Sequence, residues 1–300
     1  MGAQGKYAAE RVGDWGIPAA EGYSEATFTA SNGDNLFYRR WLSDAAAPTL
    51  VLLHGLGAHS GWFIDMGEEL HTHGLTVCAI DHRGFGRSGG PRGHVRDGSL
   101  YPRDITAFLT FLRGERPASP LYILGHSMGA LFALNVAAEG AARAQPLVTG
   151  LIIVNPWIDD QKRVSPLTVS RLLASGLAGS SKPFTTGDTA TMTTNPEALA
   201  MLEGDTFWVR AESAAFLYQV TRMRLAAIGR AKQVRAPALV IQCEADKAVK
   251  PAASRQMYDA LGSADKTWMT YAGFAHDFEF EPERARLDAD VAQWIKAHSA

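Results

Sequence analysis

The feature that most constrains this chain is an apolar run that leads into Gly-x-Ser-x-Gly and then into an alanine-rich stretch. Residues 121–124 are typical of a buried strand, and the residues after Gly129 are typical of a helix. A serine on a tight strand-to-helix turn carries its hydroxyl above the sheet, and the residues two positions before and after it must be small. Gly125 and Gly129 meet this requirement, whereas a glycine-flanked serine in an ordinary turn would lack the flanking strand and helix. We therefore expect Ser127 to be a nucleophile.

Short apolar runs alternate with helical patterns along most of the chain. The runs cover residues 49–53, 76–80, 121–124, 150–154, 238–242 and 267–271. This alternation predicts an α/β fold with a mainly parallel sheet and helices on both faces. Ahead of these runs, residues 27–30 and 36–41 flank an Asn-Gly turn, so we expect an opening antiparallel hairpin.

The alternation is interrupted between about residues 157 and 234. Helical patterns occur there at residues 166–176 and 212–229, but no convincing strand does. Residues 180–195 are rich in Ser, Thr and Gly, and we expect them to form a mobile lid loop. The predicted parts are a first core segment (1–156), an inserted helical cap or lid (157–234) and a second core segment (235–300).

The charge balance excludes several classes of function. The chain has 29 basic and 31 acidic residues with no run of like charge, so we expect no nucleic-acid partner. No stretch approaches the roughly 18 apolar residues of a membrane span, and the first residues lack a signal-peptide core, so we expect a cytoplasmic protein. Cys78 and Cys243 lie in apolar runs without metal-ligand spacing, and we expect buried thiols.

A serine hydroxyl needs a base that takes its proton and an acid that orients the base, in the chain order Ser, acid, His on an open sheet. Only His276 and His298 follow the serine, and His298 is almost at the chain end. His276 comes directly after the last predicted strand and is the expected base. Asp246 follows the run 238–242 at a strand's carboxyl end, and we prefer it as the acid over the neighbouring Glu244.

The oxyanion formed by attack on a carbonyl needs two backbone N–H donors. Met128 follows the nucleophile and would supply one N–H group. Leu56 lies in His-Gly-Leu-Gly directly after the run 49–53 and would supply the other. His54 and His126 are expected to brace these loops through hydrogen bonds. This chemistry requires no metal and no organic cofactor, and we predict neither.

On these residues the sequence resembles the monoacylglycerol lipase and lysophospholipase branch of the α/β-hydrolase superfamily. The most specific stretch, residues 81–95, reads Asp-His-Arg-Gly-Phe-Gly-Arg-Ser-Gly-Gly-Pro-Arg-Gly-His-Val. It is similar to that branch's Asp-His-Arg-Gly-His-Gly-x-Ser run with its Gly-Gly-x-Arg-Gly-His extension. The resemblance covers most of the chain outside the cap and implies the α/β-hydrolase fold. It also implies the roles inferred above for Ser127, Asp246, His276, Leu56 and Met128.

The resemblance implies a serine esterase that acts on monoacylglycerol-like or other small lipophilic esters through an acyl-enzyme. The chain departs from the branch at Ala58 and Trp62, where related lipases have a Glu and an Arg associated with the glycerol end of the substrate. The change removes hydrogen-bond partners and adds an indole, so the resemblance leaves the recognition of glycerol open. The candidate substrate-binding residues are Trp62 and, in the cap, Phe184 and Trp208.

Other functions of the same fold stay open. A thioesterase, an acyltransferase or a carbon–carbon bond hydrolase would use the same residues. A serine aminopeptidase would need carboxylates in the cap to hold an amino terminus, for which Glu203, Asp205 and Glu212 are candidates. A non-catalytic receptor for a lipophilic ligand is the alternative from a different class. The expected partner is a small lipophilic ester with transient contact to a lipid surface, and the sequence leaves the oligomeric state open.

Overall fold

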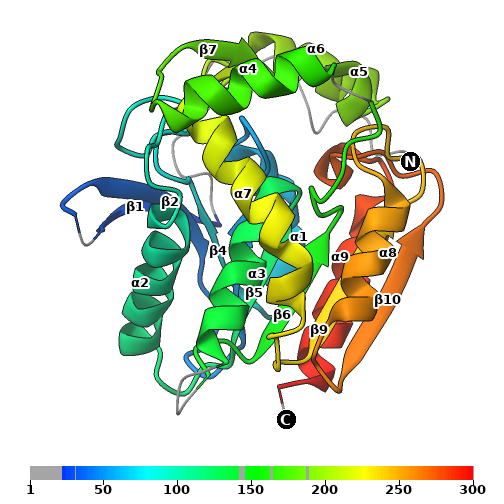
Figure 1. The fold of residues 1–300 in the computed structure, drawn as a ribbon. Coiled ribbons are helices and arrows are strands. Elements are labelled where there is room, and N and C mark those ends of the chain that lie inside the picture. The colour runs from blue at the N-terminus through cyan, green and yellow to red at the C-terminus, as the bar shows by residue number, and fades with distance from the viewer. Residues whose placement is uncertain (1–21, 31, 142–145, 163–164, 187–188, 300) are drawn as a thin grey trace.

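The protein is described by a computed structural model that covers residues 22–30, 32–141, 146–162, 165–186 and 189–299. Within these residues, eight strands form a central sheet with helices on both faces (Figure 1), so the predicted α/β fold is confirmed. The strands are β1 (Ser24–Thr29), β2 (Asn35–Trp41), β3 (Thr49–Leu53), β4 (Thr76–Ile80), β5 (Leu121–His126), β6 (Gly150–Val154), β9 (Ala238–Cys243) and β10 (Lys266–Tyr271).

The spatial order of the strands is β1-β2-β4-β3-β5-β6-β9-β10. The strands from β4 to β10 in this order pair in parallel, whereas β1–β2 and β2–β4 are antiparallel. The predicted opening hairpin is confirmed, with Thr29 opposite Asn35, although its first strand begins earlier than expected, at Ser24, and ends before Ala30. The six apolar runs are all strands of the sheet.

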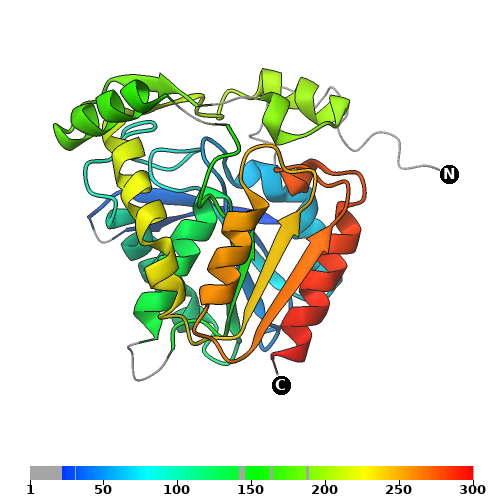
Figure 2. The same cartoon turned by 45° about the vertical axis from the view of Figure 1, so that its right-hand side comes forward.

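Helices cover the two faces of the sheet (Figure 2). The buried apolar side chains form two separate cores, one on each face. One face carries α2 (Leu100–Glu115), α3 (Met128–Gly140), α7 (Ala214–Ala231) and α8 (Pro251–Ala260), and the other carries α1 (Ile64–Thr72) and α9 (Arg284–Ala297). Cys78 and Cys243 are buried free thiols, one in each core, as predicted.

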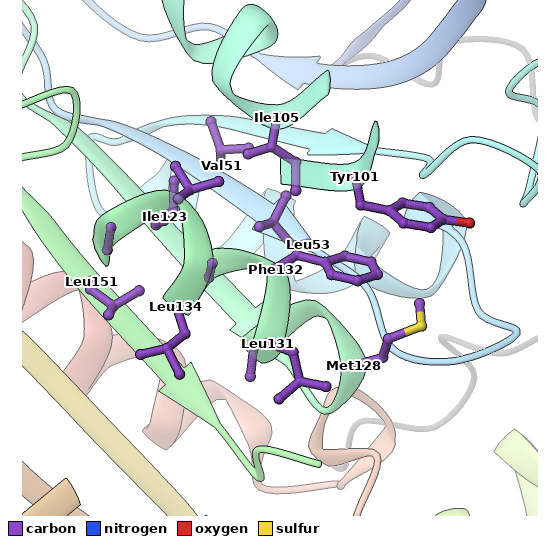
Figure 3. Close-up of a cluster of buried hydrophobic side chains, with 14 of the residues drawn as sticks. Val51, Leu53, Tyr101, Ile105, Ile123, Met128, Leu131, Phe132, Leu134 and Leu151 are labelled. Carbon is purple, nitrogen blue, oxygen red and sulfur yellow. The ribbon is translucent and has the colours of Figure 1, made fainter. Parts of the chain in front are cut away.

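The helix that follows the Gly-x-Ser-x-Gly turn lies deep in the first core. Figure 3 shows Leu131, Phe132 and Leu134 of α3 among side chains from the neighbouring strands and from α2. The ring of Phe132 stacks on Tyr101 of α2 with centroids 4.5 Å apart. Because α3 is buried on nearly every side, the turn at its first residue is held on a rigid element.

The segment between β6 and α7 lies over the carboxyl ends of the parallel strands (Figures 1 and 2). It contains α4 (Pro166–Leu177), β7 (Pro183–Thr185), α5 (Thr189–Met192), α6 (Pro196–Gly204) and β8 (Ala211–Ser213). The expectation of no strand in this segment was wrong, because β7 and β8 pair antiparallel. Each has only three residues, which is too short for an alternating pattern to be recognised. Mobility of residues 180–195 stays a prediction.

The helix α7 differs in position from the rest of the predicted cap. It packs against α4 of the predicted cap, but also against α3 and α8 beside the sheet, and Phe216 and Val220 on it belong to the first core. We therefore propose that the overlying segment, named the cap below, ends near Ser213 rather than at residue 234. None of the helices in the described ranges combines the length and apolar character that a membrane span requires.

The tight packing of the turn before α3 predicts that a side chain at Gly129 destabilises the protein. A Cβ on Gly129 would collide with the carbonyl oxygen of Leu53, so Gly129→Ala should lower the free energy of unfolding by about 1–3 kcal/mol in urea denaturation. Gly114, near the end of α2, is exposed with open space around it, so Gly114→Ala should be neutral or stabilising by up to about 1 kcal/mol. Equal stability of Gly129→Ala and the unmodified protein would contradict this packing.

Candidate active site

Ser127 occupies the sharp turn between β5 and α3. Its backbone has φ 53° and ψ −110°, a strained region for a residue with a side chain. The turn is fixed by hydrogen bonds, since the Ser127 N–H donates to the Val154 carbonyl (3.0 Å) and the Ser127 carbonyl accepts from the Trp157 N–H (3.2 Å). A Cβ on Gly125 would lie only 2.6 Å from the Cα of Ala130, so this position also requires glycine. The local geometry is that of the predicted elbow.

Hydrogen bonds run from Ser127 through His276 to Asp246. The Ser127 hydroxyl lies 3.0 Å from Nε2 of His276, and Nδ1–H of His276 donates to Oδ2 of Asp246 at 2.7 Å. The other carboxylate oxygen of Asp246 accepts from the N–H groups of Ala248 (2.7 Å) and Val249 (3.0 Å). Both oxygens of the carboxylate are therefore held, and the imidazole has its unprotonated nitrogen toward the serine.

The two alternatives for these roles lie elsewhere. The side chain of Glu244 is exposed, while the Asp246 side chain is buried against His276. His298 at the end of α9 bonds to the Trp294 carbonyl (2.7 Å) and to Asp265 (3.1 Å). Three segments that follow β5, β9 and β10 thus bring Ser127, Asp246 and His276 together at one edge of the sheet.

The electrostatic surroundings favour the positively charged form of His276. Burial alone would lower the pKa of His276, but the charge and hydrogen bond of Asp246 and the charge of Asp277 raise it above its ordinary value. Burial in turn raises the pKa of Asp277 to about 6. A histidine that is stabilised as imidazolium can accept a proton from a serine hydroxyl during attack.

The backbone carbonyl of His276 is gripped by two buried side chains. The amide Nδ2 of Asn155 donates to this carbonyl at 2.7 Å, and the Nε2–H of His126 donates to it at 3.0 Å. The Oδ1 of Asn155 accepts from the Cys243 N–H at 2.8 Å, at the end of β9 that leads to Asp246. Asn155 therefore ties the loop of the base to the strand that carries the acid.

Asn155 was missed by the sequence analysis. It follows β6 directly and has φ 44°, a left-handed conformation that asparagine tolerates better than most residues. An asparagine directly after a predicted buried strand, at the sheet edge where Ser127 and Asp246 were expected, was the available signal. Its partners lie far away in sequence, so only the position and not the contacts could have been predicted.

His54 and His126 brace loops, as expected. Burial lowers the pKa of His54 to about 4 and that of His126 well below its ordinary value, so both rings are neutral. The Nδ1–H of His54 donates to the Gly55 carbonyl (2.8 Å), and its Nε2 accepts from the His82 N–H (3.0 Å). These bonds fix the loop after β3 to the loop after β4.

The candidate oxyanion donors, Leu56 and Met128, belong to two segments that adjoin Ser127. Met128 opens α3, where backbone N–H groups have no acceptor within the helix. Leu56 lies in the loop after β3, and an ideal Cβ on the adjacent Gly55 would be 3.4 Å from the Cβ of Ser127. Gly57 has φ +74°, which favours glycine, and it lies against Trp208 and Val209 of the cap. The placement is compatible with both expected donors.

The stretch at residues 81–95 has a structural role. The Asp81 carboxylate accepts from the N–H groups of Ser60 (2.6 Å) and Arg87 (2.7 Å). Arg83 forms a two-point ion pair with Asp104 of α2, with N–O distances of 2.7 and 2.9 Å. This motif therefore links the loop after β3, the loop after β4 and α2, and so supports the side of the site that carries Leu56.

A cavity of about 420 Å³ opens above Ser127 and His276, which is a usual size for a small-molecule site. It is lined by Gly55, Leu56, Ala58, Trp62, Ser127, Trp157, Asp160, Lys162, Thr185, Thr186, Thr191, Met192, Trp208, Val209, Lys247, Ala248, Val249, His276 and Asp277. Trp62 and Trp208 thus line the cavity, and their contact with substrate stays a prediction. Phe184 is not among these lining residues. It packs against the first core instead.

The three acidic cap residues considered for an amino terminus do not line the described cavity. Glu203 is exposed, and Asp205 accepts hydrogen bonds from Nε2–H of His59 (2.9 Å) and the indole of Trp62 (2.8 Å). Glu212 is buried and accepts from the Thr186 hydroxyl, and burial raises its pKa to about 8. None of these carboxylates faces the space above Ser127.

Within the described residues, one group offers ligand atoms close enough for a metal ion, namely His126, His276 and Asp277, within 4.8 Å of one another. Both ring nitrogens of His276 already bond, to Asp246 and Ser127. A metal at this place would displace those hydrogen bonds, so the group is better explained as part of the hydrolytic site.

Hydrogen bonds from a serine through a histidine to a carboxylate, at the carboxyl ends of a parallel sheet, define a serine hydrolase with the α/β-hydrolase fold. The chain belongs to the serine aminopeptidase S33 family, which it matches over residues 44–283.

Curated and solved relatives agree with this class. The chain is 29% identical to a monoacylglycerol lipase of Mycolicibacterium smegmatis over 92% of this chain and 98% of that protein. It is 28% identical to the human monoglyceride lipase over 90% and 89% of the two chains. A soluble variant of the Saccharomyces cerevisiae monoglyceride lipase, solved with a substrate analogue, superposes with a TM-score of 0.80 at 21% identity, covering 94% and 97%. The expected resemblance to the monoacylglycerol lipase branch is confirmed.

The hydrogen bond from Asn155 to the His276 carbonyl predicts that Asn155 positions the base. Asn155→Asp keeps the acceptor for the Cys243 N–H but replaces the donor to His276 by an anionic oxygen. We expect kcat to fall by about 10- to 100-fold with little change in KM, because a small displacement of a catalytic group has effects of this size.

A matched control is Asn135→Asp, since Asn135 is also buried and donates to a carbonyl, that of Leu131 at 2.8 Å, but within α3. Both variants are compared at equal folded fraction, judged by thermal unfolding. An Asn155→Asp protein with unchanged kcat, or an equal loss in Asn135→Asp, would show that the Asn155 bond does not position the base.

Proposed function

We propose that this protein hydrolyses small lipophilic carboxylic esters with a single acyl chain, including monoacylglycerols, through an acyl-enzyme on Ser127. The observation that carries the proposal is the hydrogen-bonded series Ser127, His276 and Asp246 at the base of a largely apolar cavity. The monoacylglycerol lipases among its relatives support this substrate class.

In the first half-reaction the Ser127 hydroxyl attacks the ester carbonyl while Nε2 of His276 takes its proton. The N–H groups of Leu56 and Met128 hold the oxyanion of the tetrahedral intermediate. Asp246 keeps the imidazole in the required tautomer and stabilises its positive form. The protonated His276 then gives its proton to the leaving alcohol, which leaves an acyl ester on Ser127.

In the second half-reaction water replaces the alcohol. His276 removes a proton from the water, the hydroxide attacks the acyl carbonyl, and the same N–H groups hold the second oxyanion. Proton return to the Ser127 oxygen releases the carboxylic acid and restores the site. Every group that this cycle uses belongs to the chain or to water.

The cavity supports an ester more strongly than an amino-terminal peptide. An amino terminus would need an uncompensated carboxylate facing the cavity. Asp160, which lines it, is already paired with Arg224 at 2.7 Å and accepts from the Trp157 indole at 2.6 Å. The other described lining carboxylate, Asp277, directly follows His276, and its charge helps to raise the pKa of that base.

The positions of Ala58 and Trp62 support a site that does not select glycerol. Ala58 offers a methyl group, and the indole N–H of Trp62 is occupied by Asp205. Neither side chain therefore offers a hydrogen bond to a polar alcohol, although both line the cavity.

The test is the ratio of kcat/KM for a medium-chain monoacylglycerol and the methyl ester of the same acid. We expect values within about threefold of each other, because glycerol hydroxyls gain few hydrogen bonds. Ser127→Ala should lower kcat on both esters by at least about 10³-fold while the protein stays folded.

A preference of about 100-fold for the glycerol ester would mean that glycerol is specifically recognised. Retained turnover in Ser127→Ala would reject the acyl-enzyme route. The absence of turnover on both esters, with hydrolysis of thioesters, would move the assignment to a thioesterase.

We also propose that α4 makes transient contact with a lipid surface. Leu167 and Leu177 on this helix are 59% and 73% exposed, and Val169 is exposed as well. The helix carries Arg171 and no acidic residue, so its charge does not oppose anionic lipid. Exposed apolar side chains on a helix of the cap suit a protein that takes its substrate from a lipid phase.

The lipid contact is tested by sedimentation with phosphatidylcholine vesicles. A variant with serine at positions 167, 169 and 177 should bind vesicles about tenfold more weakly, because less apolar surface enters the interface. The control is Leu225→Ser, since Leu225 is 82% exposed but lies on α7, which packs against α3 and α8. Equal vesicle binding by all three proteins would exclude α4 as the contact.

A further inference from the structure

Among the described residues that line the cavity, three are tryptophans, and they come from three separate segments. Trp62 belongs to the 3-10 helix Ser60–Phe63 after β3, Trp157 follows β6, and Trp208 lies in the cap between α6 and β8. Tryptophan side chains therefore line the cavity from the loop after β3, from the loop after β6 and from the cap.

Two of these tryptophans adjoin residues that would take part in the reaction. The backbone N–H of Trp157 donates to the carbonyl of Ser127 at 3.2 Å, so this residue directly adjoins the nucleophile. The indole of Trp208 rests on Gly57, where a Cβ would lie 2.8 Å from its Nε1. Gly57 is next to Leu56, so Trp208 adjoins the loop of the candidate oxyanion donor.

The indole N–H groups of Trp62 and Trp157 are already used. Trp62 donates to Oδ2 of Asp205 at 2.8 Å, and Trp157 donates to Oδ1 of Asp160 at 2.6 Å. Burial alone would raise the pKa of Asp205, but its hydrogen bonds, among them those from His59 and Trp62, lower it, so the carboxylate is ionised and a strong acceptor. These two rings can offer a substrate only their carbon edges and faces.

The rings are also held in place from outside the cavity. The guanidinium of Arg210 lies 4.2 Å from the ring centre of Trp208, and that of Arg224 lies 4.7 Å from the ring centre of Trp157. Trp62 and Trp208 meet edge to face with centroids 6.0 Å apart. Rings fixed before binding lose little freedom when a ligand arrives.

We propose that the cavity selects esters that carry an aromatic ring, on the acyl or on the alcohol side, over esters with a saturated ring of the same carbon skeleton. This proposal rests on the proposed ester hydrolysis and names its substrate class. Aromatic rings pack edge to face or offset against indoles, and their quadrupoles add attraction beyond the apolar area that they bury. A cyclohexyl group buries a similar apolar area but has no ring quadrupole and so lacks this additional attraction.

The experiment compares kcat/KM within two pairs of esters. The acyl pair is methyl phenylpropanoate against methyl cyclohexylpropanoate, and the alcohol pair is benzyl butanoate against cyclohexylmethyl butanoate. Each ratio is divided by the ratio of the alkaline hydrolysis rates, which removes differences in intrinsic reactivity. We expect an aromatic preference of about fivefold to tenfold in at least one pair, and the pair that shows it identifies the side on which the ring binds.

Substitutions of the tryptophans test whether the preference for aromatic esters depends on their indole rings. Trp157→Leu and Trp208→Leu should each bring the ratio closer to one, whereas Trp157→Phe keeps a ring and should retain most of the preference. The control is Trp268→Leu, because Trp268 is also partly buried but lies on β10 against Tyr258, outside the described cavity. It should leave the ratio unchanged.

The outcomes separate this proposal from the proposed function. Serine-dependent hydrolysis of all four esters with both ratios at or below one would overturn the aromatic preference and leave ester hydrolysis intact. A preference that survives in both Trp157→Leu and Trp208→Leu would also overturn it. No serine-dependent hydrolysis of any of the four esters would overturn both.

Discussion

The close approach of α3 to the carboxyl ends of β3 and β5 is the constraint on which the site depends. Glycine at positions 125 and 129 removes the Cβ atoms that would collide with Ala130 and with the Leu53 carbonyl. Ser127 must then adopt a left-handed backbone at the join, which aims its hydroxyl into the cavity and starts α3 at Met128. A rigid, buried helix holds this strained turn, so the nucleophile does not depend on a flexible loop.

The remaining groups of the site come together because neighbouring parallel strands end at the same edge. β5, β6 and β9 are adjacent, and β10 is next to β9, so the loops that carry Ser127, Asn155, Asp246 and His276 converge. Asn155 links two of these loops through its amide, which fixes the distance between the acid and the base. The cap then closes the site through Asp205, which bonds to His59 and Trp62 of the core.

The sequence predicted the parts of the site that are encoded locally or by chain order. The elbow was recognisable because the strand, the glycines and the helix around Ser127 are contiguous, and His276 because few histidines follow it. The hydrogen bonds of Asn155 to His276 and of Asp205 to Trp62 could not be predicted, since the partners lie 121 and 143 residues apart in the sequence. The sequence does not show which polar residues meet across such distances. The sequence also could not tell that α7 packs beside the sheet, because an amphipathic pattern does not identify the surface that it contacts.

The most direct test of the account is covalent labelling with a fluorophosphonate, followed by peptide mapping of the adduct. The phosphorus is attacked by the activated serine, fluoride leaves, and the adduct mimics the tetrahedral intermediate. We predict one adduct on Ser127 in the folded protein, none in Ser127→Ala and much slower formation in His276→Ala. A folded protein that stays unlabelled, or that is labelled at a different residue, would contradict the assignment of Ser127 as the nucleophile.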